Sequence, residues 1–241
     1  MRQASLRHLV AVVLLAGAVP SPGLSQPIEH ARSQTSPSAD GEDPEELSGL
    51  AEGPYSTMSA LLEVTIFEID VLTLTVRVGP EGAARLAALA AGHEYSEALA
   101  DSVASVLLDA ERAWARQVFM RDVSFGRLLG GMRETARKAA EAEYITEGYY
   151  EQFSENLPVW FGFLEETGVK KGDQILFSVR GDSLRTVFRT LDGRVLLDRH
   201  AEGAEARRAS IPSFFAPGTR FRKRLVESLL TGDTPEDRAS G

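Results

Sequence analysis

The chain of 241 residues contains no cysteine, which excludes disulfide bonds, cysteine nucleophiles and a lipid anchor on cysteine. It also lacks a glycine-rich phosphate loop, a Gly-x-Ser-x-Gly elbow and a His-Glu-x-x-His motif. In the part of the chain that we expect to fold, the histidines are His93 and His200, and each is isolated in the sequence. A metal site needs clustered ligands. We therefore predict neither a metal site nor a cofactor.

Long apolar runs are missing except at the amino terminus. Residues 1–25 have the pattern of a secretory signal peptide, with arginine at positions 2 and 7 and an apolar core of 11 residues from Leu9 to Val19. Small residues for cleavage follow in Gly23-Leu24-Ser25. The alternative is a membrane anchor, but the run is too short to span ~30 Å of hydrocarbon. We expect an exported protein, periplasmic or secreted, with no membrane span after removal of the signal.

Apolar residues are scarce between the signal and the folded part. Residues 26–53 are rich in Ser, Pro, Glu and Asp, and their apolar surface is too small to offset chain entropy. We predict a disordered linker, in which the acidic residues from position 40 onwards are Asp40, Glu42, Asp43, Glu45, Glu46 and Glu52. Residues 54–231 contain 25 acidic and 22 basic residues, so most of the net charge of −9 lies outside them. This balance does not indicate nucleic-acid binding. Residues 232–241 form a polar tail.

Hydrophobic periodicity within residues 54–231 predicts the elements of one domain. Period-two alternation indicates strands at 62–67, 72–78 and 114–122. Period-3.6 patterns and capping residues indicate helices at 81–91, 96–110, 146–166 and near the carboxyl terminus from Thr219, and another that starts after Ser124. Pro158 should kink or restart the helix in which it lies. Strands, helices and strands in this order predict an α+β domain, with helices against one face of a mainly antiparallel sheet.

The stretch from Gly172 to Gly193 predicts two strands and the start of a third. Ile175, Phe177 and Val179 alternate with more polar residues, as in a sheet with one covered face. Gly181-Asp182 and Asp192-Gly193 are turn dipeptides, and a return strand begins at Val195. Because aromatic helices precede this meander and a helix follows it, we expect these side chains to be buried together: Phe153, Trp160, Phe177 and Leu225.

The same stretch carries a resemblance. A helix, then Lys-Gly-Asp, a short apolar strand, a glycine turn, a strand that ends in Asp-Gly and a closing helix resemble the carboxyl-terminal half of the chalcone isomerase-like family. The resemblance covers residues 54–231 and suggests a bacterial exported member. It implies an open-faced, mainly antiparallel sheet with helices packed on one face and a ligand cleft between the two layers.

The resemblance also implies which residues a catalytic member should carry. Chalcone isomerases cyclise a bound phenolate, with an arginine at the start of an early strand and tyrosine and threonine hydroxyls that position the ketone. The matching place here is residues 57–78. Its entry reads Ser59-Ala60-Leu61-Leu62 without arginine, and its second strand begins Asp70-Val71-Leu72 without tyrosine. We therefore assign no catalytic residue. An intramolecular lyase with rearranged residues stays as an alternative.

Relatives in this family bind fatty acids in the same cleft, with an arginine on the carboxylate. The resemblance therefore implies a small apolar or amphipathic acid as the ligand, which needs an apolar pocket and one cation. We expect Arg77 to be the anchor, with Thr73 and Thr75 on the same strand face, and Arg116 as the second candidate. The alternative for Arg77 is an exposed arginine at a strand end. A structural or partner-binding protein with a filled cleft is the remaining functional alternative.

Overall fold

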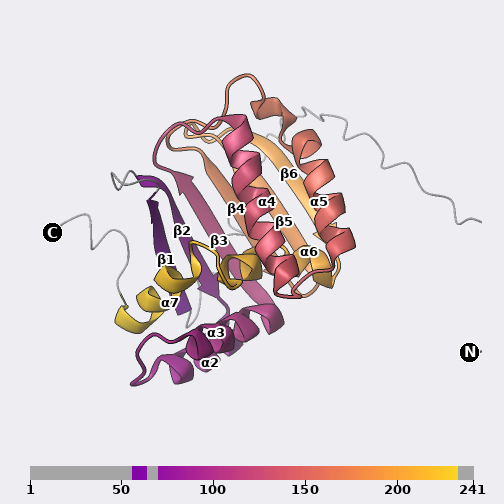
Figure 1. Ribbon diagram of the computed structural model, residues 1–241. Coiled ribbons are helices and arrows are strands. Elements are labelled where there is room, and N and C mark those ends of the chain that lie inside the picture. The colour runs from indigo at the N-terminus through magenta and orange to yellow at the C-terminus, as the bar shows by residue number, and fades with distance from the viewer. Residues whose placement is uncertain (1–55, 64–69, 233–241) are drawn as a thin grey trace, which may run out of the picture. The chain divides into compact units, whose positions relative to one another are not determined.

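The computed structural model describes residues 56–63 and 70–232, with side chains for 56–62 and 72–232 (Figure 1). The predicted signal peptide and linker lie outside these residues, as do positions 64–69 and 233–241. The strands are β1 (Ser56–Glu63), β2 (Asp70–Val78), β3 (Arg112–Phe119), β4 (Gln174–Arg180), β5 (Ser183–Arg189) and β6 (Val195–Glu202). They form one six-stranded sheet in the order β1-β2-β3-β4-β5-β6. Every neighbouring pair is antiparallel, which confirms the predicted α+β class.

The helices lie in three places: between β2 and β3, between β3 and β4, and after β6. Helices α2 (Pro80–Ala90) and α3 (Glu97–Asp109) join β2 to β3. Helices α4 (Phe125–Glu141) and α5 (Glu147–Trp160) and the short 3₁₀ helix η1 (Gly162–Leu164) join β3 to β4. After β6 come α6 (Ala204–Arg208), the 3₁₀ helix η2 (Ile211–Phe215) and α7 (Arg222–Thr231). Figure 1 shows α4, α5 and α7 in front of one face of the sheet, as the open-faced architecture requires.

Strand register separates the side chains of the sheet into two faces. On the face that the helices cover, one row across β2 to β6 consists of Val76, Ala115, Phe177, Thr186 and Arg199. On the opposite face, called the outer face below, the neighbouring row consists of Thr75, Arg116, Leu176, Val187 and Asp198. Because successive side chains on a strand point to opposite faces, these two rows fix the direction of most side chains in the sheet.

The predicted helix at 146–166 is α5 followed by η1, and Pro158 lies inside α5. Proline has no N–H, so it cannot donate to the carbonyl four residues earlier, that of Ser154. The Nη2 atom of Arg133 on α4 donates to this carbonyl instead, at 3.2 Å. The helix therefore continues to Trp160 rather than breaking at the proline. The same hydrogen bond ties α5 to α4.

The predicted core is confirmed for two of its four residues. Phe177 and Leu225 are buried, and Phe177 packs edge-to-face on Phe214 of η2 with ring centroids 6.0 Å apart. Phe153 and Trp160 are only half-buried, so the expectation that they are buried with the others was wrong. They pack edge-to-face on each other, 5.7 Å between centroids, and both line a cavity.

Candidate ligand-binding cavity

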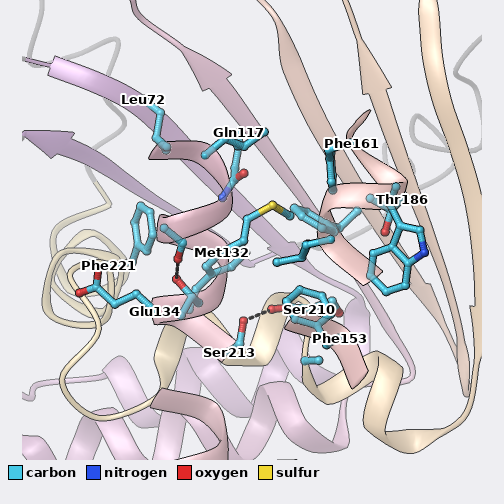
Figure 2. Close-up of a pocket in the computed structure, with 18 of the residues that line it drawn as sticks. Leu72, Gln117, Met132, Glu134, Phe153, Phe161, Thr186, Ser210, Ser213 and Phe221 are labelled. Atoms are coloured by element: carbon cyan, nitrogen blue, oxygen red, sulfur yellow. Dashed lines mark hydrogen bonds between the residues drawn. The ribbon is translucent and has the colours of Figure 1, made fainter. Parts of the chain in front are cut away.

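A cavity of about 500 Å³ lies between the helix-covered face of the sheet and the layer formed by α4, α5, α6 and η2 (Figure 2). Strands β2 to β6 form its floor, and helix α4 contributes residues from Arg127 to Lys138. In Figure 2 Gln117 and Met132 project into the same space from opposite layers.

Most of the cavity wall is apolar or aromatic. Its floor includes Leu72, Phe119, Phe177 and Leu197 from the strands. Its roof and ends include Leu128, Met132, Phe153, Leu157, Trp160, Phe161, Phe214 and Phe221. A wall of this kind binds hydrocarbon by removing it from water, at about 0.8 kcal/mol for each buried CH₂ group.

Two buried polar side chains on the cavity floor have no hydrogen-bond partner among the described residues. Gln117 on β3 and Thr186 on β5 are each 8% exposed, and both line the cavity. Buried amides and hydroxyls are nearly always hydrogen-bonded in proteins, because an unpaired one costs about 1–3 kcal/mol. An amide and a hydroxyl of this kind, directed into a cavity, are available to a ligand.

A half-buried arginine lines the same floor. Arg199 on β6 is the register partner of Thr186, and its Cζ atom lies 3.8 Å from the centre of the Trp160 ring. Burial lowers the pKa of Arg199, and the nearby Tyr149 raises it. Burial likewise raises the pKa of Tyr149, while Arg199 lowers it. Arginine stays protonated in proteins despite such shifts. Within the described part of the chain, no carboxylate forms an ion pair with Arg199, so its charge is uncompensated.

Two other cations of the cavity lining, Lys138 and Arg220, differ from Arg199 because they have acidic neighbours. Lys138 lies 2.6 Å from Glu141, and Arg220 lies 3.8 Å from Glu134. Arg121 and Arg127 also line the cavity, in the segment that joins β3 to α4 and in the first turn of α4. The cation on the sheet floor, Arg199, is thus best placed to attract an anionic group.

Helix α5 is held in place at its N-cap residue, Thr146, by a carboxylate from α6. The backbone N and the Oγ1 atom of Thr146 both donate to Oε1 of Glu205, at 2.8 and 2.6 Å. The Thr146 hydroxyl also accepts from the N–H of Tyr149, which caps the helix. These bonds with Thr146 lower the pKa of Glu205. The hydrogen bonds with Thr146 fix the start of α5, the helix whose residues Tyr149 and Trp160 lie next to Arg199.

The residues predicted from the sequence as ligand contacts lie on the outer face. Thr73, Thr75 and Arg77 share that face, as expected from their spacing, and Arg116 lies opposite Thr75. None of these four lines the cavity described above. The hypothesis that Arg77 anchors an acid therefore concerns the other side of the sheet and stays a prediction. His93 is exposed, and His200 lies on the outer face with Nε2 3.7 Å from Asp198.

Sequence reasoning missed Arg199, although its signal is present. Leu197, Arg199 and Ala201 are two residues apart, so they share one face of β6. The two apolar neighbours identify that face as the covered one, which places a cation toward the core. The contact with Trp160 joins residues 39 positions apart, and no local pattern contains it.

No protein-family model matches this sequence, and no curated protein matches it either. Among solved structures, the crystal structure of the Arabidopsis thaliana fatty-acid binding protein is similar, with a TM-score of 0.44 and 11% sequence identity. The match covers 74% of this chain and 88% of that one. The fold given above follows from the strand pairing of this chain itself. Within residues 56–63 and 70–232, no helix combines the length and apolar character needed to cross a membrane.

Proposed function

We propose that this protein binds a fatty acid or a similar apolar acid in its cavity, with the carboxylate on Arg199. The observation that carries the proposal is the half-buried guanidinium of Arg199, which has no ion pair among the described residues, in the floor of a mostly apolar cavity. A buried charge without a partner is costly. A carboxylate supplies the missing charge, and an alkyl chain fills the apolar remainder.

The size and chemistry of the cavity suit such a ligand. Its volume of about 500 Å³ lies within the ~300–1,000 Å³ that is usual for small-molecule sites. The contact with Trp160, 3.8 Å from the guanidinium carbon to the ring centre, restrains the guanidinium, so less side-chain freedom is lost when a carboxylate binds. The hydroxyls of Tyr149 and Thr186 lie beside this position. A cavity of this size also favours ligand binding over a structural protein with a filled cleft.

A second candidate is an isomerase with rearranged residues. The observation in its favour is that an arginine, a tyrosine and a threonine, Arg199, Tyr149 and Thr186, meet at the cavity. These are the residue types that the resemblance to chalcone isomerases implies. Ring closure of a hydroxychalcone forms one C–O bond and moves one proton to carbon, so no cofactor is needed. Loss of the chalcone absorbance in the presence of the protein would support this candidate if Arg199→Gln abolishes it.

The compartment belongs to the proposal as well. We propose a bacterial, exported member of the chalcone isomerase-like family whose mature chain begins near Gln26, on the sequence pattern of residues 1–25. N-terminal sequencing of the protein from the producing cell tests this point. A retained Met1 in a cytosolic fraction would contradict export but would leave the cavity proposal untouched.

Native mass spectrometry of the purified protein tests ligand binding. We expect a fraction of the protein to carry an additional mass that matches a fatty acid, and this mass should vanish after delipidation and return after oleate is added. Protein that stays unliganded after oleate is added in excess would overturn the proposal.

A further inference from the structure

The outer face of the sheet is strongly basic in a chain that is acidic overall. By strand register, two acidic side chains on this face are Asp198 and Glu202. Its arginines are Arg77, Arg112, Arg116, Arg180, Arg185 and Arg189. Among the described side chains of the strands, six arginines against two acids give this face a positive charge, with Arg185 already paired to Asp198 at 2.8 Å, although the whole chain has a net charge of −9. Such a separation of charge attracts an anionic partner to one side of the sheet.

At the centre of the outer face lies a small buried cluster of Trp114, Leu176 and Val187. Arg77 and Arg116 flank the indole, with Cζ atoms 5.6 and 5.8 Å from the ring centre. Trp114 is 8% exposed, yet its Nε1 has no hydrogen-bond partner among the residues that the structure describes. In the same described ranges, the buried Nε atoms of Arg77 and Arg116 also have no partner. Three unpaired donors around one ring indicate that an acceptor belongs there.

A shallow hollow of about 130 Å³ extends this surface across β4, β5 and β6. It is lined by Ser178, Arg180, Ser183, Arg185 and His200. Hydroxyls and guanidinium groups together are a common setting for carboxylates and other oxyanions. The hollow and the Trp114 cluster lie on the same face, so one extended acidic partner could contact both.

The chain itself contains such a partner just before β1. Residues 40–52, outside the described part of the structure, hold six acidic residues and no basic one. The chain enters the sheet at Ser56, which pairs with Val78, next to Arg77. Arg112 and Arg180 lie at this same end of the sheet. Extended chain covers ~3.3 Å per residue, so the 16 residues from Asp40 to Ser56 can span ~50 Å, twice the ~24 Å from β1 to β6.

We propose that the acidic segment 40–52 docks on the outer face of the sheet. Its carboxylates accept hydrogen bonds from the donors around Trp114 and neutralise the charges of Arg77 and Arg116. The proposal is independent of the cavity, which lies on the opposite side of the sheet. It also gives Arg77 and Arg116 a carboxylate partner that is a side chain of the same protein, rather than the ligand acid expected from the sequence.

Zero-length crosslinking of the full chain tests this docking. Carbodiimide joins lysine amines to carboxylates in direct contact, and the native lysines are Lys138, Lys170, Lys171 and Lys223. The substitution Arg116→Lys adds an amine beside Trp114. We expect intramolecular crosslinks from position 116 to residues 40–52. We expect these crosslinks to be lost at about 1 M salt, where the Debye length falls to ~3 Å.

Two control chains separate docking from chance encounter. Arg137→Lys places an amine on the exposed part of α4, in the layer that covers the other face, and should give no crosslink to residues 40–52. The second control is the Arg116→Lys chain in which the six acidic residues of segment 40–52 are changed to Asn or Gln, and there the crosslink from position 116 should disappear. Equal crosslinking from positions 116 and 137 would overturn the proposal. So would crosslinks from position 116 that are only intermolecular, because the occupant would then be a second copy of the chain.

Discussion

Arg199 and Trp160 lie in contact across the cavity, with the guanidinium carbon 3.8 Å from the ring centre. Arg137 and Tyr150 form a second pair of this kind, at 4.8 Å, but Arg137 is exposed and also donates to the Tyr150 hydroxyl at 2.9 Å. The two pairs therefore share their chemistry and differ in solvent exposure. Because a cation on an aromatic ring is stabilised more strongly when water is excluded, we expect the first pair, rather than the second, to respond to a bound ligand.

Replacing Arg199 by glutamine should weaken the binding of a fatty acid. A charged hydrogen bond contributes about 1.5–3 kcal/mol, which corresponds to about a tenfold to hundredfold change in Kd. The methyl ester should bind the wild type and Arg199→Gln almost equally, since it has no charge to lose. Displacement of a fluorescent fatty-acid probe measures both ligands, and circular dichroism checks that the variant is folded.

Two other arginines serve as controls for this experiment. Arg137→Gln removes a stacked surface arginine and should leave the Kd unchanged. Arg77→Gln removes the anchor predicted from the sequence, which lies on the outer face. If Arg77→Gln weakens acid binding and Arg199→Gln does not, the sequence prediction is right and the ligand does not bind in the cavity.

Replacing Thr186 by valine should not destabilise the protein in the absence of ligand. The Thr186 side chain lines the cavity and forms no hydrogen bond with another described residue, so removal of its hydroxyl should leave the free energy of unfolding unchanged or raise it by up to about 1 kcal/mol. Thr219→Val is the matched control, because the Thr219 hydroxyl donates to the carbonyl groups of Phe214 and Ala216 at 2.7 and 2.9 Å. That variant should lose about 1 kcal/mol in urea unfolding. A larger loss for Thr186→Val would mean that its hydroxyl is satisfied.

The sequence predicted the fold well because the fold depends on local patterns. Ser96 was expected to cap a helix, and its hydroxyl accepts from the N–H of Leu99 at the start of α3. The turns at Gly181 and Gly193 have φ of 55° and 88°, which glycine adopts without a Cβ clash. The segment from α6 through η2 was not predicted, since its helices of five residues each are too short to show periodicity.

The candidate cavity could not be predicted from the sequence, because it depends on contacts between distant residues. Period two places Arg77 and Arg199 on a strand face equally well, but it does not say which face the helices cover. That choice follows from α4 and α5, whose packing on the sheet puts Tyr149 and Trp160 beside Arg199. Arg77 instead lies beside Trp114 on the outer face. Because the early strand has no catalytic arginine, the sequence favoured the next arginine, Arg77 on β2, whereas the candidate cation in the cavity is Arg199 on β6.

Replacing Phe177 by alanine should strongly destabilise the protein. Phe177 is 7% exposed in the centre of the sheet, and an aromatic-to-alanine change in a packed core costs about 3–5 kcal/mol. Thermal and urea unfolding measure the loss. Phe163→Ala is the matched control, because Phe163 is 38% exposed, and it should cost about 1 kcal/mol. An equal effect of the two substitutions would mean that Phe177 does not lie in the core.

The contact between Glu205 and Thr146 should make stability depend on pH. The hydrogen bonds from Thr146 hold the pKa of Glu205 below its ordinary value of 4.5. A carboxyl whose pKa is depressed in the folded state stabilises the protein fully above the unfolded-state pKa, and this contribution is lost as the pH falls through the folded-state pKa.

Glu205→Gln should therefore lose about 1 kcal/mol of unfolding free energy at pH 7, discounted for its exposed position. The difference from wild type should shrink as the pH falls below 4.5. Urea unfolding between pH 7 and acid pH measures it, with Glu151→Gln on the exposed side of α5 as the control. A difference that stays constant down to acid pH would show that Glu205 acts at the start of α5 without its charge.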